Sequence, residues 1–215
     1  MSFIVQFFQQ GGAFMYPILI VFALGVAIAV ERYMYLTVTG ASNRKMWKEI
    51  VPYLKAGNFQ QAVGKTSKSK SAIGKVMTYG LYRVASARRR DDIEKAMEES
   101  LMEVLPRLEK RTHYLATFAN IATLLGLLGT IMGLIAAFTA VANANPAEKA
   151  DMLSASISVA MNTTALGLMV AIPLLFMHTV IQTKTNQIID SLEMASVKFL
   201  NAVTERDGEA KGVAA

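Results

Sequence analysis

Residues 114–141 read YLATFANIATLLGLLGTIMGLIAAFTAV and contain no charged side chain. The charge-free run around them extends over residues 112–147, and two further charge-free runs cover residues 1–30 and 152–183. A helix needs about 20 apolar residues to cross the hydrocarbon core of a bilayer, so each run is long enough to span it. The sequence therefore predicts an all-α integral membrane protein with three transmembrane helices.

The composition excludes several classes of protein. Of the 215 residues, 53% are hydrophobic and 18% are charged, whereas a soluble domain carries about 25% charged residues. A soluble enzyme, a disordered tail and a secreted disulfide scaffold are thereby excluded. The chain has no cysteine, which excludes disulfides, thiolate metal sites and cysteine nucleophiles. No hydrolase or transferase constellation is visible, so we expect no enzymatic activity, no metal site and no cofactor.

Positive charge is concentrated in one part of the chain. The formal net charge is +6, and 17 of the 22 Lys and Arg residues lie from Arg32 to Arg111. Because Lys and Arg are retained on the cytoplasmic side of membrane proteins, the N-terminus is predicted outside and the C-terminus inside. The basic run at 88–90 lacks the interleaved aromatic residues of a nucleic-acid site, so we expect a solvated or lipid-facing surface and no nucleic-acid partner.

The segment between the first two spans has a helical pattern with interruptions. Gly57-Asn58 and the run 64–71 are expected to divide it into short helices. Gly64-Lys65-Thr66 resembles the end of a phosphate-binding loop. Phe59 stands where that loop needs a glycine, and no buried strand precedes it, so ATP binding is excluded.

A longer helix is predicted from Asp91 to Arg111, because acidic residues come early in it and basic residues late, which suits the helix dipole. This helix is expected to run straight into the second span and to bend at Pro106. The predicted segments, in chain order, are an outer interfacial helix (1–12), the first span (13–36), a cytoplasmic helical segment (37–112), the second span (113–142), a periplasmic hairpin (143–156), the third span (157–183), a cytoplasmic helix (184–206) and a disordered tail (207–215).

Small and hydroxyl residues share one face of the second and third spans, whereas the first span is bulky and is expected to face lipid. Such faces usually serve close helix packing, and a membrane threonine commonly bonds a carbonyl of its own helix. Hydroxyls nevertheless recur at similar depth on two helices, with Asn162 added, so the face could instead line something polar or receive another helix. The residues concerned are Thr123, Gly126, Thr130, Gly133 and Ala137 on the second span, and Ala160, Thr163, Thr164, Gly167 and Ala171 on the third.

No span contains an Asp or Glu at mid-depth. Ion-coupled membrane proteins usually rely on a buried ionisable group, so this chain alone is not expected to couple to an ion. His178 is the one titratable side chain within the third run, and its neighbours at helical spacing offer no relay. We expect it to lie near the inner interface.

Two motifs carry a resemblance to a known family. Residues 125–135, LGLLGTIMGLI, followed by Ala137-Phe138, resemble the second-span signature of the ExbB/TolQ/MotA family, and residues 163–173, TTALGLMVAIP, resemble its third-span signature. The three spans and the large cytoplasmic segment are similar to the ExbB/TolQ branch, whereas the MotA branch has four spans.

The resemblance implies a subunit of an ion-driven motor in the bacterial inner membrane, with a periplasmic N-terminus and a cytoplasmic C-terminus. In that family five copies form a ring around the spans of two ExbD/TolR-like partners, each with an essential aspartate. Flow of H⁺ or Na⁺ is thought to rotate the ring, and the work passes on through the partner or a TonB- or TolA-like protein. Thr130 and Thr164 fall on the family's pore threonines.

The third-span motif also departs from the family pattern. ExbB and TolQ proteins often carry a glutamate five residues before the third-span threonine, where this chain has Val159. Hydroxyl oxygens can coordinate a hard cation. We therefore hypothesise that the absence of this acid, together with the presence of Thr163, shifts the transported ion from H⁺ toward Na⁺. The candidate ion-pathway residues are Thr130, Thr163, Thr164 and Asn162. Those expected to serve helix packing or the pore face are Gly126, Gly129, Gly133, Gly167 and Pro173, the last of which leaves a carbonyl unpaired.

A second class of function stays open. The chain could be a structural membrane scaffold, whose small faces serve only helix packing and whose basic segment recruits cytoplasmic partners. The sequence leaves open the ion, the envelope process, the identity of the partner, the stoichiometry and the role of the cytoplasmic segment.

Overall fold

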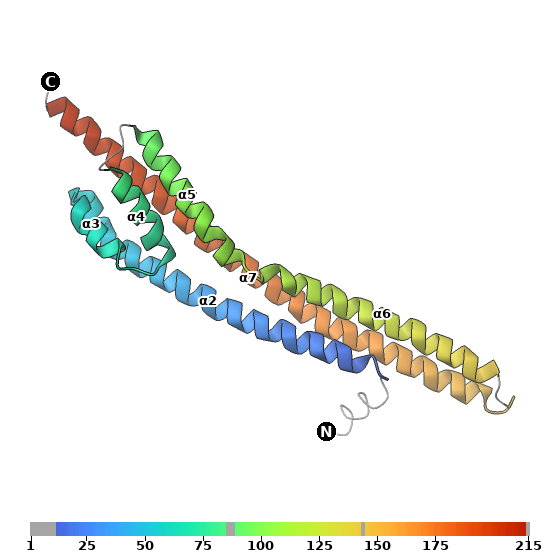
Figure 1. Cartoon of the computed structure of the whole chain (residues 1–215). Coiled ribbons are helices and arrows are strands. Elements are labelled where there is room, and N and C mark those ends of the chain that lie inside the picture. Colours follow the sequence, from blue (N-terminus) through green and yellow to red (C-terminus); the bar gives the residue numbers. More distant parts are fainter. Residues whose placement is uncertain (1–11, 85–88, 143–144, 214–215) are drawn as a thin grey trace. The chain divides into compact units, whose positions relative to one another are not determined.

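The computed structural model describes residues 12–84, 89–142 and 145–213, with side chains described as far as residue 205. These residues form helices joined by short connections, and no strand occurs among them. The helices are α2 (Met15–Ala56), α3 (Phe59–Thr66), α4 (Ala72–Val84), α5 (Arg90–Glu109), α6 (Thr112–Ala142) and α7 (Lys149–Val213) (Figure 1).

Three helical stretches are long and apolar enough to cross a membrane. They are Met15–Ala56, Arg90–Ala142 and Lys149–Glu205. The prediction of an all-α membrane protein with three spans is thereby confirmed, and the chain is a multi-pass membrane protein.

The chain divides into two compact units. One contains Met1–Arg32 and Arg111–Ile181 and is called here the apolar unit, because it holds the three charge-free runs. The other contains Tyr33–Lys110 and Gln182–Ala215 and is called the basic unit, because most of the Lys and Arg residues lie in it. Each unit has its own buried core.

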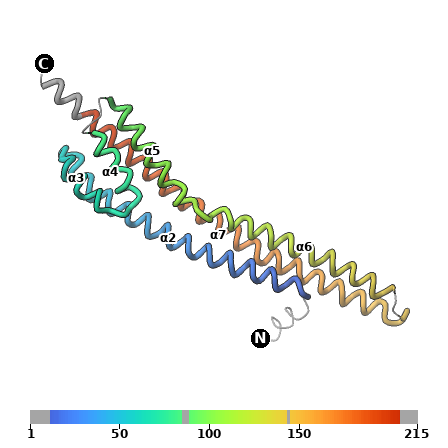
Figure 2. Tube along the Cα trace, viewed as in Figure 1, coloured from blue at the N-terminus to red at the C-terminus, as the bar shows by residue number. Residues whose placement is uncertain are grey.

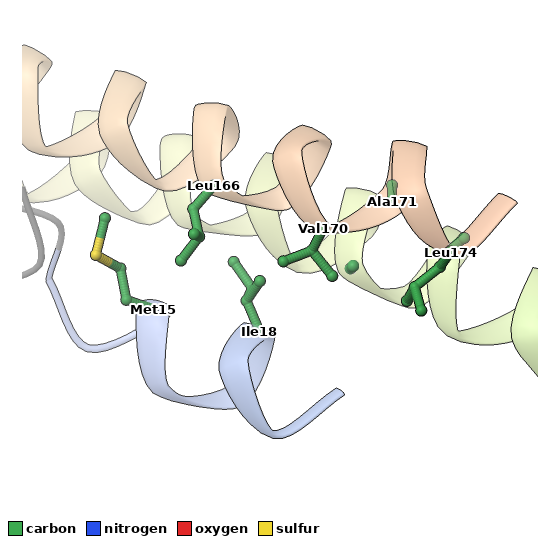
Figure 3. Packing of buried hydrophobic residues seen from close by; sticks show 8 residues of the cluster. Met15, Ile18, Leu166, Val170, Ala171 and Leu174 are labelled. Carbon is green, nitrogen blue, oxygen red and sulfur yellow. The ribbon is translucent and has the colours of Figure 1, made fainter. Parts of the chain in front are cut away.

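The core of the apolar unit joins the first turns of α2 to α6 and α7. Met15 and Ile18 of α2 are fully buried and point toward Leu166 and Val170 of α7 (Figure 3). Alanines of α6 and α7 complete this cluster, and their small size lets the helices approach. The first span therefore does not face lipid all round, since one edge of it belongs to the core. Other large side chains of this span, such as Ile20, Leu24 and Val30, are exposed.

The basic unit is organised around α4. A Cβ atom added to Gly80 of α4 would lie 2.8 Å from Met97 Sδ of α5 and 2.9 Å from Phe199 Cε1 of α7, so this glycine sits where three helices meet. At the start of α4, the amide of Ile73 donates a hydrogen bond to Oδ1 of buried Asn43 on α2, at 3.2 Å. A side chain distant in sequence thus caps this helix.

A lysine fastens α7 to α2 within the basic unit. Lys184 Nζ donates to the hydroxyl of Thr37 at 2.6 Å and lies 3.9 Å from the centre of the Tyr33 ring. The ammonium group therefore combines a hydrogen bond with a cation–π contact, both to the same face of α2.

The breaks between helices agree in part with the expected ones. α2 ends at Ala56 and Gly57 follows with a φ of 66°, a left-handed conformation that glycine adopts without strain. Gly64 lies inside α3, so the second interruption begins only after Thr66. Figure 2 traces α3, α4 and α5 as separate pieces, as the sequence predicts for this segment.

The expectation of a straight helix into the second span is wrong. α5 ends at Glu109, Lys110 has a ψ of 131°, and Arg111 has a φ of 65°. These dihedral angles cannot continue the α-helical ladder, so α6 begins afresh at Thr112. Pro106 lies inside α5, three residues before its end.

α7 is longer than the segments predicted for it. It begins at Lys149 and runs unbroken to Val213, so it includes most of the predicted hairpin and most of the predicted disordered tail. The predicted interfacial helix at 1–12 lies almost wholly outside the described residues, which begin at Gly12.

Candidate functional site at the crossing of α6 and α7

The backbones of α6 and α7 approach most closely at two glycines. A Cβ atom on Gly126 would lie 3.2 Å from the Cα of Thr164, and a Cβ atom on Gly167 would lie 2.7 Å from the backbone oxygen of Ala122. The contact at Gly167 leaves no room for a methyl group, and the one at Gly126 would be unusually tight. Glycine at Gly167 is therefore needed for this crossing, and glycine at Gly126 favours it.

The close contact continues along both helices. The side chain of Thr163 fills the space next to Gly129, and a Cβ atom on Gly133 would lie 2.9 Å from that of Ala160. The three glycines of α6 thus face successive turns of α7 in antiparallel order. This is the small-residue packing that brings membrane helices together without bulky side chains.

A hydrogen bond joins the two helices at the crossing. The hydroxyl of Thr164 donates to the backbone oxygen of Gly126 at 2.9 Å. Both residues lie near the middle of their charge-free runs. Thr164 itself is half-buried within the single chain.

The other predicted hydroxyls bond within their own helices. Thr163 is 2% exposed and donates to Val159 O at 3.0 Å, while half-buried Thr130 donates to Leu127 O at 2.6 Å. Thr163 is therefore enclosed in the packing of the chain. Asn162 is half-buried on α7, and Pro173 lies inside the same helix. The structure thus brings Thr164 and Thr163 against α6, and the hydroxyl of Thr164 bonds across the crossing.

Comparison with known proteins identifies a family whose model includes the residues of this crossing. The family model described as the MotA/TolQ/ExbB proton channel family matches residues 68–194, which include α4, α5, α6 and the α7 residues of the crossing. The chain belongs to this family. Its second- and third-span motifs contain the glycines and threonines of this close helix contact.

Relatives named ExbB and TolQ extend the likeness over most of the chain. The ExbB homolog of Methanothermobacter thermautotrophicus is 28% identical over 89% of this chain and 67% of its own length. The biopolymer transport protein exbB1 of Vibrio cholerae is 29% identical over 80% of this chain and 76% of its own. The Tol-Pal system protein TolQ of Haemophilus influenzae is 33% identical over 44% of this chain and 41% of its own.

Ion-coupled membrane proteins usually rely on a buried ionisable group, and the described part of the apolar unit has no carboxylate at mid-depth. Its described carboxylates are Glu31, Glu148 and Asp151, all at the ends of the charge-free runs. Among the described residues there is also no group of three or more His, Cys, Asp or Glu side chains that could hold a metal. The described residues of the apolar unit thus supply no carboxylate in the middle of the spans.

Two features of this family member escaped the sequence analysis. Glu31 pairs with Arg111, whose Nη1 lies 3.4 Å from Glu31 Oε2, across 80 residues of sequence. No local pattern predicts a pair so distant, nor the left-handed turn that holds Arg111. The sequence also does not predict that Thr164 lies against Gly126, because the small-residue faces of the two helices could pack in more than one register. The i, i+3 and i+4 spacing of small residues was the only signal of the contact.

Proposed function

We propose that this chain is the ring-forming subunit of an ion-driven motor in a bacterial inner membrane. With an ExbD/TolR-like single-span partner, it would convert proton or sodium motive force into mechanical work on the cell envelope. The family supports a proton-channel, energy-transducing subunit without covalent chemistry. The remaining elements of the proposal rest on the geometry described above and on the relatives' names, which include biopolymer transport and the Tol-Pal system.

The observation that carries the proposal is the hydrogen bond from Thr164 to Gly126. It places a hydroxyl in the middle of the spanning segments, in a chain with no carboxylate at that depth. In lipid a polar group must find a partner inside the protein. A carboxylate on a partner helix could exchange with the Gly126 carbonyl as the group that accepts this hydroxyl, and so move past it in steps.

The outer faces of α6 and α7 support assembly into a ring. Large apolar side chains on both helices are more than half exposed in the single chain, among them Leu124, Phe138, Met169, Ile172 and Phe176. These faces need lipid or a neighbouring subunit as cover. A pentamer around two partner helices, with some faces against neighbours and others against lipid, satisfies this requirement.

In this proposal the partner's carboxylate, and not a residue of this chain, carries the ion. Thr163, the residue that favoured Na⁺ in the sequence, donates to the carbonyl of Val159 and is enclosed. A buried hydroxyl already bonded to its own helix is a poor ligand for a moving cation. We therefore assign the ion to the partner's carboxylate, with Thr130 and Thr164 along its path. Activity that persists without sodium and collapses with a protonophore would support H⁺, and the opposite result would restore the role of Thr163.

The assembly is tested by measuring the mass of the detergent-solubilised complex. The chain is purified with and without the ExbD/TolR-like protein encoded nearest to its gene. The expected result is five copies alone and five copies with two partners when both are expressed. A monomer or dimer that ignores the partner would contradict the motor and favour the scaffold.

A further inference from the structure

A cavity of about 270 Å³ lies in the basic unit between α2, the start of α4 and the end of α5. Three of its lining side chains, Lys70, Lys75 and Arg107, are cationic, and no acidic residue is among the described residues that line it. Tyr35, Thr39 and Ser42 of α2 also line the cavity and carry hydroxyl groups. Cations and hydroxyls without a carboxylate form the donor set that binds a phosphate group.

The cations of this cavity are only weakly neutralised by the protein. Arg107 Nη2 lies 3.7 Å from Glu103 Oε1, and both side chains are more than half exposed. A solvent-exposed pair of this kind contributes at most about 1 kcal/mol, so it competes poorly with a bidentate anion. Three like charges around one cavity repel each other unless an anion binds between them.

The start of α4 adds to the positive potential. Residues 70–72 lead into this helix at the cavity wall, where the helix dipole is positive. The amide groups there already have acceptors: Ile73 N donates to Asn43, and Gly74 N donates to the Ser71 hydroxyl at 3.1 Å. The helix end therefore contributes its field, and the side chains are left to bind the anion.

The position of the cavity along α2 indicates the source of the phosphate. Glu31 is the first charged residue after the run 1–30, and Tyr35 and Thr39 follow four and eight residues later on the same helix. At about 1.5 Å per residue, these side chains lie about 6 and 12 Å beyond Glu31. The headgroup layer occupies about 5–8 Å on each side of the hydrocarbon core, so the end of the cavity at Tyr35 lies at its level and the rest extends beyond it.

We propose that this cavity binds the phosphate group of an anionic membrane phospholipid, with Lys70, Lys75 and Arg107 as its ligands. The cavity is smaller than the roughly 300–1,000 Å³ pockets that enclose whole small molecules. It suits a headgroup whose acyl chains stay in the bilayer. The bound lipid would tie α2, α4 and α5 together at the membrane surface, independently of any ion that the apolar unit conducts.

The test is titration of the purified full-length chain in detergent with phosphatidylglycerol, followed by native mass spectrometry. Phosphatidylcholine and inorganic phosphate are titrated in parallel to distinguish a headgroup site from a site for free phosphate. The test variant is Lys70→Gln, Lys75→Gln, Arg107→Gln combined. The matched control removes three exposed cations of α2 outside this cavity, as Arg44→Gln, Lys45→Gln and Lys48→Gln.

The expected result is saturable binding of phosphatidylglycerol that weakens at least about tenfold in the test variant, since more than one charge-assisted hydrogen bond is lost. The control variant should bind as the natural chain does. A second variant, Lys70→Arg with Lys75→Arg, keeps the charges and should retain binding, which separates lost contacts from lost folding.

Three outcomes would overturn the proposal. Equal weakening in the test and control variants would mean diffuse attraction to a basic surface. Equal affinity for phosphatidylcholine would mean that the acyl chains, and not the cations, hold the lipid. Inorganic phosphate binding as tightly as phosphatidylglycerol would place the source in solution. None of these results bears on ion conduction, so failure here leaves the proposed function intact.

Discussion

The two units of this chain hold their helices together with different polar contacts. In the apolar unit, the hydroxyl of Thr164 on α7 donates to the backbone oxygen of Gly126 on α6. In the basic unit, side chains of one helix bond to side chains or amides of another, as Asn43 does with Ile73 and Lys184 with Thr37. The hydrogen bonds between helices thus differ in kind between the two units.

The difference follows from the surroundings of each unit. Within a bilayer no water can satisfy an exposed polar group, and burying a charged side chain costs free energy. A hydrogen bond from a hydroxyl to a backbone carbonyl satisfies polar groups there without introducing a charge. It works only where backbones approach closely, which glycines allow. In water, long charged and amide side chains can reach across wider gaps. A larger side chain should therefore destabilise the apolar unit more than the basic unit. Removal of a polar side chain should destabilise the basic unit more than the apolar unit.

Gly167→Val should produce the largest effect. A Cβ atom there would lie 2.7 Å from the backbone oxygen of Ala122, and a backbone atom cannot move aside cheaply. We expect a loss of about 3 kcal/mol, at the upper end for overpacking, together with loss of assembled protein. Thermal unfolding of the purified chain in detergent measures this. An unchanged midpoint would show that the helices do not cross here.

Asn43→Ala should have an intermediate effect, confined to the basic unit. The substitution leaves the buried amide of Ile73 without its acceptor at the start of α4, which should cost about 1–2 kcal/mol. Asn201→Ala is the matched control, because its bond to Arg90 is exposed to solvent. Equal unfolding midpoints for both variants would mean that α4 does not depend on this cap.

Gly64→Ala should have the smallest effect, and in the opposite direction. Gly64 lies inside α3, and a Cβ atom there would meet nothing within 4 Å. Alanine should stabilise this helix by about 0.5–1 kcal/mol, since glycine loses more backbone entropy on folding. Hydrogen exchange of the α3 amides reports this. Faster exchange in the variant would contradict the open surroundings of this glycine.

Much of the fold could be predicted from the sequence because hydrophobic runs fix spans by length alone. The three spans, the short helices around Gly57 and the small faces of the second and third spans were all visible in the pattern. The family motifs likewise carried the functional class. These features depend on local composition, which a single chain displays directly.

Details that depend on distant contacts could not be predicted. The break at Lys110–Arg111 interrupts a pattern that is periodic on both sides, and no glycine or proline marks it. The pairing of Arg111 with Glu31 and the enclosure of Thr163 follow from how helices meet in space. Thr163 and Thr164 are neighbours with equal propensities, yet only the structure distinguishes the buried hydroxyl from the one that bonds across the crossing.

The central claim is that the Thr164 hydroxyl takes part in ion-driven work and does not merely pack two helices. The most direct measurement is ion flux through the complex with its ExbD/TolR-like partner in proteoliposomes. Thr164→Val keeps the shape of the side chain and removes the hydroxyl, and Thr164→Ser keeps the hydroxyl. Thr139→Val is the control, because the Thr139 hydroxyl donates to Ile135 O of its own helix at 2.8 Å.

Flux should fall at least about tenfold in Thr164→Val, the scale of a lost polar contact in a water-poor site. It should stay close to the natural level in Thr164→Ser and in Thr139→Val, with all complexes assembled at equal mass. Natural flux in Thr164→Val would contradict the account and leave the crossing of α6 and α7 as a packing contact of a structural scaffold.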